Sequence, residues 1–456
     1  MKCLLKGGTV VSGSGCTKQD VLMEDGIIVK VENDLADADA QVVDVTGKLL
    51  FPGFIDGHTH FDLEVSGTVT ADDFSTGTKA AITGGTTMII DFATQNQGET
   101  LKEALANWHR KADGKSSCDY GFHMAFSEWN ESLGAELDEM MDHGVTSFKM
   151  YMTYGNMLND KEIFKALSRL KEVGGIAGVH CENKELIDAL IEAEKARGNL
   201  GPDAHPRTRP AQVEAEAINR LLYIAGLVDI PVIVVHLSSK AGYEEILRAR
   251  TRGQKVYVET CPQYLLKDDS CYQLPGFESA KYAIAPVIKS QEDQDCLWEA
   301  VLSGQIDTIS TDHCSFTMAQ KEAGISDFTK IPCGMPGVET RPVLMYTYGV
   351  KKHGMTLEQM CRLLSENPAK LYGVYPRKGV IAPGSDGDIV VWDPEEKWVL
   401  TDENQVANTD YQPFAGTAVE GRAQMVYLRG RLAAENGRVV REEEGVFIPR
   451  GKPMEG

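Results

Sequence analysis

The chain has 456 residues, of which 42% are hydrophobic, so it is long enough for one large domain and a smaller one. Its formal net charge of −21 would repel nucleic acid and anionic membranes, and we expect neither as a partner. The apolar run near the start is too short for a signal peptide, and no stretch reaches the roughly 18 apolar residues of a membrane span.

Residues 1–50 are predicted to form short strands separated by turns. Runs rich in β-branched residues, such as GGTVVSG and AQVVDVTGKLL, alternate there with glycine and aspartate. This pattern indicates a small antiparallel sheet, which would be the first part of a β domain.

Residues 51–380 are predicted to form a (β/α)₈ barrel, which places the chain in the α/β class. Eight short apolar runs, from LLFPGFIDG to IDTISTDHC, recur with stretches between them whose apolar residues lie three or four positions apart. Eight units of a strand followed by a helix are typical of such a barrel. An open doubly wound sheet is the alternative, but no glycine-rich phosphate loop follows the first strand.

Residues 381–456 return to the hairpin-like pattern of the first fifty, in GVIAPGSDGDIVVWDP and AQMVYLRGRLAAENGRVV. We therefore expect the two ends of the chain to join into one small β domain beside the barrel. The last dozen residues look like a loosely held tail, although such a tail can also dock on a neighbouring subunit.

Titratable side chains stand at the ends of the predicted barrel strands. The C-terminal strand ends of a parallel barrel meet on one face, where active sites are built. A single histidine that closes an apolar strand is more often hydrogen-bonded within the core, but burying this many titratable groups without a cation would cost several kcal/mol each. The pattern therefore predicts a metal site. Its candidate residues are His58, His60, Lys149, His180, His236 and Asp312.

Lys149 is the unusual member of this set, since a protonated amine would repel a metal ion. Burial and positive neighbours favour the neutral amine, which can take up carbon dioxide and become a carbamate. The carbamate could bridge two metals, one held by the side chains of residues 58, 60 and 312 and the other by those of residues 180 and 236. Alternatively, Lys149 could point outward into solvent.

The motifs resemble the dihydropyrimidinase and hydantoinase branch of the cyclic amidohydrolases. The resemblance runs over nearly the whole chain and is carried by GFIDGHTHF, SFKMYMTY, GVHCEN, VHLSS, STDHC, GMPGVE and ENPAKLYG. It implies a (β/α)₈ TIM-type barrel with a small β-sandwich formed by both chain ends, and commonly a homotetramer. It also implies two divalent metals, usually zinc, that are bridged by a carboxylated Lys149.

The resemblance further implies an activity and residue roles. The activity is the opening of cyclic ureides, such as 5-substituted hydantoins or 5,6-dihydropyrimidines, to N-carbamoyl amino acids. Asp312 would be the general base that passes a proton to the leaving nitrogen, and the Tyr154 hydroxyl would support the oxyanion. The ten cysteines form no CxxC pair, which is typical of reduced thiols in a cytoplasmic protein.

Two positions depart from the family pattern and leave the substrate open. Ala285 replaces a serine and Cys333 an asparagine, at positions that hold the ureide mainly through the backbone. A dihydroorotase or an allantoinase is the alternative enzyme, and a non-catalytic relative is the alternative class. Against a dihydroorotase, Asp62 stands where those enzymes carry an arginine, although Lys289 or Arg341 could supply a cation.

Overall fold

Residues 2–453 are described by the computed structural model, and its central feature is a sheet of eight parallel strands. Strands that follow one another along the chain are also neighbours in the sheet. A parallel bridge between Thr59 and His313 connects the first strand to the segment after the last one, so the barrel is nearly closed. The predicted barrel is confirmed, and the doubly wound alternative is wrong. The strands are β8 (Phe54–Thr59), β11 (Thr86–Thr94), β12 (Asp119–Ala125), β13 (Ser147–Tyr151), β14 (Ile176–His180), β15 (Val232–Val234), β16 (Val256–Thr260) and β17 (Thr308–Ile309).

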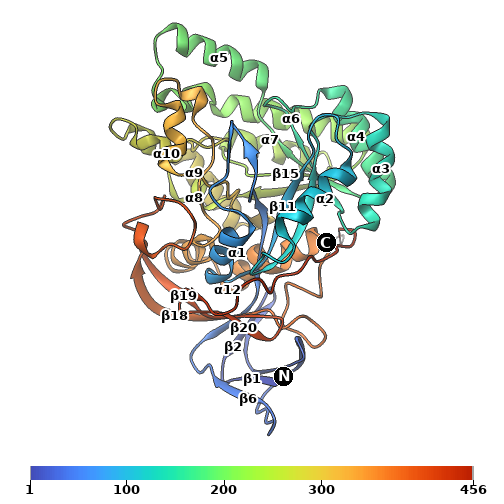
Figure 1. Cartoon of the computed structure of the whole chain (residues 1–456), viewed down its shortest axis with the longest axis vertical. Coiled ribbons are helices and arrows are strands. Elements are labelled where there is room, and N and C mark those ends of the chain that lie inside the picture. Colours follow the sequence, from blue (N-terminus) through green and yellow to red (C-terminus); the bar gives the residue numbers. More distant parts are fainter. Residues whose placement is uncertain (1, 454–456) are drawn as a thin grey trace.

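Helices alternate with these strands and surround the barrel (Figure 1). Their ends follow local sequence signals: the Asn159 side chain caps α4 together with Glu162, and Gly174 ends it with φ of 75°. Within residues 2–453, no helix is both long and apolar enough to cross a bilayer. The main helices are α1 (Phe74–Thr83), α2 (Leu101–Ala112), α3 (Glu131–Asp142), α4 (Asp160–Val173), α5 (Lys184–Ala196), α6 (Ala211–Val228), α7 (Lys240–Thr251) and α9 (Gln291–Leu302). Shorter ones are α8 (Pro262–Leu266), α10 (Met318–Lys321), α11 (Arg341–Leu344), α12 (Leu357–Cys361) and α13 (Asn367–Leu371).

Two further sheets form the β domain, at the end of the molecule that carries the blue and red strands in Figure 1. One has the order β5-β4-β1-β6 and the other the order β21-β20-β19-β18-β7-β2-β3. The smaller sheet contains β1 (Lys2–Lys6), β4 (Asp20–Glu24), β5 (Ile27–Glu32) and β6 (Gln41–Asp44). The larger contains β2 (Thr9–Ser12), β3 (Gly15–Lys18), β7 (Leu49–Pro52), β18 (Ile389–Val399), β19 (Ala418–Leu428), β20 (Arg431–Glu435) and β21 (Arg438–Val439).

The prediction of a purely antiparallel sheet in residues 1–50 is wrong. β1 pairs in parallel with β6, and β2 pairs in parallel with β7. The reason is that the chain passes to the larger sheet after β1, returns to the smaller one after β3 and passes to the larger one again after β6. These crossings let β6 and β7 run in the same direction as their neighbours β1 and β2. The union of both chain ends is confirmed, because β7 pairs with β18. The division into residues 1–50, 51–380 and 381–456 stays our proposal for the domain limits.

The predicted first barrel strand, LLFPGFIDG, is two strands. It divides at Gly53, where the chain leaves the larger sheet of the β domain and enters the barrel as β8. The Gly53 amide donates to Asp388 O, and a β-carbon at this position would lie 2.0 Å from Thr87 Oγ1. Only glycine lets the backbone pass this closely, so the boundary is set by sterics.

The last described residues do not form a loose tail. They run along the barrel, where the Tyr120 amide donates to Val446 O and the Ile448 amide donates to Tyr120 O. The guanidinium of Arg450 is buried and donates to the carbonyls of Phe122 and Tyr372. These backbone and side-chain bonds hold the segment on its own barrel.

Candidate metal centre and substrate cavity

One cavity of about 500 Å³ lies at the C-terminal ends of the barrel strands and contains every predicted site residue. A cavity of this size is in the range of small-molecule sites. Its lining includes the six predicted ligands and three predicted substrate contacts: His58, His60, Lys149, His180, His236, Asp312, Tyr154, Ala285 and Cys333.

Three of the predicted ligands form a tight group. His58 Nε2 and His60 Nε2 each lie 3.1 Å from Asp312 Oδ1. His58 and His60 come from the end of β8, two residues apart on one face, and Asp312 follows β17. The near-closure of the barrel brings its first and last strands together, which explains why His58 and His60 meet Asp312 from far along the chain.

The other three predicted ligands lie beside this group. The rings of His180 and His236 have centroids 4.6 Å apart, and the His236 ring lies 5.4 Å from that of His58. Lys149 is buried, and its Nζ lies 3.3 Å from His58 Nε2. The alternative in which Lys149 points outward into solvent is therefore wrong.

A buried glutamate, Glu259 at the end of β16, holds two of the histidines. Its Oε1 accepts from the backbone amide of His236 and lies 2.7 Å from His58 Nδ1. The bond to Nδ1 directs His58 Nε2 toward Asp312, as is usual for histidines that bind metals. Sequence reasoning missed Glu259, although an acidic residue in the apolar run VYVET was a signal for it.

Glu182 and Arg209 form a second support that the sequence did not reveal. Glu182 Oε2 lies 2.8 Å from His180 Nε2 and also accepts from Arg209 Nη1. Both side chains are almost completely buried, and Arg209 also lines the cavity. The guanidinium and the His180 contact lower the pKa of Glu182 to about 2 against the opposing effect of burial. Glu182 therefore remains ionised and fixes the His180 ring.

Three residues of the site have a left-handed backbone. The φ angles are 68° at Tyr154, 40° at His236 and 53° at Asp312. Residues with a β-carbon rarely adopt this region, and they persist there only where the surroundings fix them. Among residues 2–453, eight other non-glycine residues also have a positive φ, so this backbone form is not confined to the site. Here it directs side chains into the cavity.

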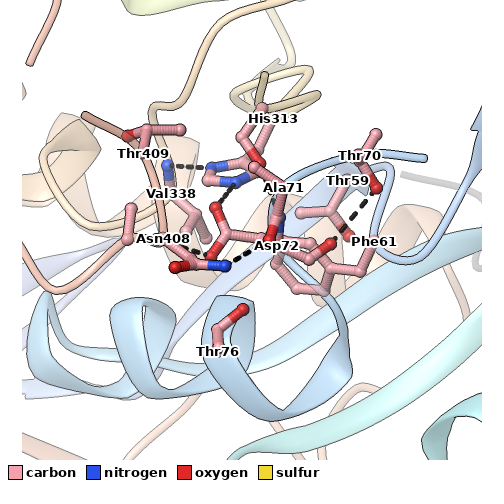
Figure 2. Close-up of polar contacts among 12 residues, drawn as sticks. Thr59, Phe61, Thr70, Ala71, Asp72, Thr76, His313, Val338, Asn408 and Thr409 are labelled. Carbon is pink, nitrogen blue, oxygen red and sulfur yellow. Dashed lines mark hydrogen bonds and ion pairs between the residues drawn. The ribbon is translucent and has the colours of Figure 1, made fainter. Parts of the chain in front are cut away.

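The loop that carries Asp312 is anchored through its neighbour His313 (Figure 2). His313 Nε2 lies 3.0 Å from Asp72 Oδ2, and its Nδ1 accepts from the amides of Gly337 and Val338. The second Asp72 oxygen accepts from the amide of Asn408. Asp72 follows the hairpin of β9 (Glu64–Val65) and β10 (Thr68–Val69). Its two oxygens therefore connect the end of this hairpin to the loop after β17 and to the β domain.

The charges in the cavity suit deprotonated ligands. Burial lowers the pKa of Lys149 to about 8, which makes the neutral amine accessible. Burial also lowers the pKa values of His60, His180 and His236, so these rings are neutral near pH 7. His58 is the exception, because Glu259 and Asp312 raise its pKa against the effect of burial. The contacts with His58 and His60 in turn hold the pKa of Asp312 well below its usual range despite burial.

These residues fit a divalent metal centre. Neutral imidazoles and carboxylates are the side chains that bind such ions, and here they converge on one point. His58, His60 and Asp312 each offer a donor atom within 4.8 Å of the others. Among residues 2–453, His60 Nδ1 and His236 Nδ1 are buried ring nitrogens without a hydrogen-bond partner. The donor set is therefore better explained by a bound cation than by hydrogen bonding alone.

The model of the amidohydrolase family matches residues 49–433. The chain belongs to this family. It is 41% identical to a D-hydantoinase of Geobacillus stearothermophilus, over 99% of this chain and 97% of that one. It is 38% identical to a D-phenylhydantoinase of Escherichia coli strain SE11, over 98% of this chain and 99% of that one. The crystal structure of a dihydropyrimidinase from Brevibacillus agri NCHU1002 superimposes with a TM-score of 0.98, at 42% identity and full coverage of both chains.

These comparisons confirm the predicted branch, and with it the prediction that this amidohydrolase is a cyclic amidohydrolase. The two basic side chains that could have bound the carboxylate of dihydroorotate, those of Lys289 and Arg341, bond to backbone carbonyls instead. Lys289 donates to Arg209 O and Val287 O, and Arg341 donates to Ile55 O and Ile309 O. Neither belongs to the described cavity lining, and Asp62 does not belong to it either.

Proposed function

We propose that this amidohydrolase opens uncharged cyclic ureides to N-carbamoyl amino acids. The substrates would be 5-substituted hydantoins or 5,6-dihydropyrimidines. We also propose that it uses two divalent metal ions and that these are zinc. The observation that carries the proposal is the convergence of four histidines, Lys149 and Asp312 in one cavity. The proposed ligands of one metal are His58, His60 and Asp312, and those of the other are His180 and His236.

Lys149 is the proposed bridge. Its neutral amine would add to carbon dioxide and lose a proton, and the carbamate would carry a negative charge into a site with several imidazoles. When bound, the two metals would activate a water molecule and polarise the substrate carbonyl. Glu259 and Glu182 would keep the His58 and His180 rings oriented for this role.

Asp312 and Tyr154 are the proposed catalytic residues. His58 and His60 hold the pKa of Asp312 well below its usual range, so its carboxylate is ionised. We propose that it accepts the proton and passes it to the leaving nitrogen. Burial raises the pKa of Tyr154 well above its usual range, so its hydroxyl keeps its proton and can donate to an oxyanion. The Tyr154 ring lies 5.0 Å from that of His180, at the edge of the metal cluster.

The cavity favours a neutral ring with an apolar substituent. Leu63, Val65, Ile284 and Ile331 line it, together with Glu64 from the hairpin. Arg209 is the guanidinium in the lining, but it is already bonded to Glu182. A substrate carboxylate would therefore lose its hydration without gaining a free cationic side chain. Ala285 and Cys333 are the proposed backbone contacts to the ureide.

Turnover of a substrate panel tests this proposal. The panel contains dihydrouracil, hydantoin, phenylhydantoin, dihydroorotate and allantoin, and metal content per chain is measured on the same preparation. We expect kcat/KM to be highest for dihydrouracil, hydantoin or phenylhydantoin, and a higher value for allantoin would favour an allantoinase. A value for dihydroorotate that equals or exceeds those for dihydrouracil and the hydantoins would favour a dihydroorotase, and absence of both metal and turnover would favour a non-catalytic protein.

Assembly and location complete the proposal. We propose a homotetramer in the cytoplasm that has no nucleic-acid or membrane partner. The supporting observations are the family resemblance, the formal charge of −21 and the ten unpaired cysteines.

A further inference from the structure

Lys321 is a buried lysine that the proposed reaction does not use. It ends the short helix α10, its side chain is completely buried, and it lies outside the described cavity lining. Its Nζ donates to three backbone carbonyls, Ala283 O at 3.3 Å, Pro332 O at 2.9 Å and Gly334 O at 2.9 Å. An ammonium group has three N–H donors and no acceptor, so these carbonyls satisfy it completely.

No carboxylate compensates the charge of Lys321. Burial lowers its pKa to about 8, and within residues 2–453 the groups that raise this pKa are the thiols of Cys333 and Cys314. The amine therefore still carries its proton at pH 7. Lys378, which is also buried, is by contrast paired with three aspartates. Burying an ammonium against carbonyls alone is costly, which indicates a role beyond packing.

The three carbonyls belong to two segments of the cavity wall, residues 283–285 and 332–335. The residues of these segments that line the cavity are Ile284, Ala285, Cys333, Gly334 and Met335. The Gly334 amide donates to Ala283 O, so the two segments lie side by side. Lys321 reinforces this contact from outside the lining, because it binds the first segment through one carbonyl and the second through two.

Unpaired backbone groups lie directly beside the paired ones. Ile284 O is paired with His205 Nε2 at 2.8 Å. Within residues 2–453, however, neither the amide nor the carbonyl of Ala285 or of Cys333 has a hydrogen-bond partner. Buried backbone groups are normally paired, so groups that are left free in a cavity wall are available to a ligand. A cyclic ureide carries both N–H donors and carbonyl acceptors and can bond to both kinds of group.

The charge of Lys321 also strengthens one of these free donors. The carbonyl of Pro332 and the amide of Cys333 belong to the same peptide group. A cation at the carbonyl oxygen draws electron density from this group, and hydrogen bonds in such a chain polarise one another. The Cys333 amide is therefore a stronger donor toward a substrate carbonyl.

We propose that Lys321 is a positioning residue of the substrate site. It holds residues 283–285 and 332–335 at the spacing at which the free backbone groups of Ala285 and Cys333 bind one cyclic ureide. This inference rests on the proposed function, since it concerns how the same substrate is held. Because Lys321 lies outside the described lining, it acts through the backbone and not on the ring itself.

The test compares the steady-state kinetics of Lys321→Met, Lys321→Gln and the matched control Lys330→Met, with hydantoin and dihydrouracil as substrates. Lys330 is exposed and close to Cys333 in the sequence, so its replacement removes the same charge without affecting the three carbonyls. Methionine is similar to lysine in length but has no donor, whereas glutamine keeps two N–H donors on a shorter, uncharged side chain.

We expect KM to rise about 10- to 100-fold in Lys321→Met, less in Lys321→Gln and not at all in the control. Metal content per chain should equal that of the control, because no proposed metal ligand lies in either segment. A role in folding alone would lower the amount of folded enzyme but would leave the KM of the folded fraction unchanged.

A second arm measures hydrogen–deuterium exchange by mass spectrometry on peptides that contain residues 283–285 and 332–335. We expect faster exchange of these peptides in Lys321→Met than in the control, because the Gly334 amide bonds to a carbonyl that Lys321 also holds. Exchange needs no turnover. If the unmodified enzyme turns over none of the proposed substrates, the proposed function fails, while exchange still decides whether Lys321 positions the two segments.

A KM of folded, metal-loaded Lys321→Met within about twofold of the control would overturn the proposal. Unchanged exchange in both segments would overturn it as well. Loss of metal in proportion to turnover would assign Lys321 to the metal centre and would also overturn it. If Lys321→Met does not fold, Lys321→Gln is judged by the same criteria.

Discussion

Glu259 offers a direct test of how the proposed metal centre is held. Its Oε1 serves two donors, His58 Nδ1 at 2.7 Å and the His236 amide at 3.2 Å, while its Oε2 is buried without a partner. In Glu259→Gln, the amide oxygen can accept both bonds, but the negative charge is lost and the new NH₂ group has no acceptor. In Glu259→Ala, both bonds are lost and the His58 ring is free to rotate.

Loss of a group that hydrogen-bonds a metal-bound histidine lowers the metal affinity by about 10- to 100-fold. We expect the metal affinity to fall about 10-fold in Glu259→Gln and about 100-fold in Glu259→Ala. These losses correspond to about 1.4 and 2.8 kcal/mol of binding free energy. The order follows from the structure, because glutamine retains the geometry and alanine does not. Both variants should lose turnover in proportion to their metal content.

The assay is competition for zinc with a chelator, combined with metal content per chain and circular dichroism to check folding. Glu339→Gln is the matched control, since Glu339 also accepts from two backbone amides, those of Val406 and Ala407, but lies outside the described cavity lining. Its zinc affinity should equal that of the unmodified enzyme. An affinity of Glu259→Ala within about twofold of the control would refute the reasoning.

Three further predictions address the remaining groups. Lys149→Ala should lose bound metal and turnover together, and retention of both would exclude the bridge. In metal-replete Asp312→Asn, kcat should fall on the order of 10² or more, because the amide cannot accept a proton; a near-normal kcat would place the proton acceptor elsewhere. Burial raises the pKa of Glu339 to about 7, so the folded state holds a proton that the unfolded state releases above about pH 4.5. Stability should therefore fall between pH 5 and pH 8, by up to about 3 kcal/mol relative to Glu339→Gln. Urea unfolding at each pH measures this difference, and parallel curves for the two proteins would contradict it.

The sequence was sufficient to predict the barrel and the group of side chains that meets in its cavity. His58, His180, His236 and Asp312 each close or follow a predicted strand, and a parallel barrel brings such ends to one face. No side-chain contact had to be known for that step, because strand direction alone determines it.

Contacts between elements could not be predicted in the same way. Arg209 reaches Glu182 across 27 residues, from a segment without regular periodicity. The parallel pairs in residues 1–50 depend on which sheet each strand joins, and the partner of β7 comes from the other end of the chain. Hydrophobic alternation identifies a strand but not its neighbours.

The pairing of β7 with β18 has a consequence for biosynthesis. Roughly 340 residues separate the two strands, and at about 5–20 residues per second a ribosome needs about 20–70 s to make them. Throughout that interval, while the barrel is being synthesised, β7 has an apolar edge whose partner does not yet exist. A nascent chain that stalls before residue 389 would thus present an open strand edge. We expect such stalled chains to be bound by chaperones or to aggregate, which makes the speed of translation through the last quarter of the message important for yield.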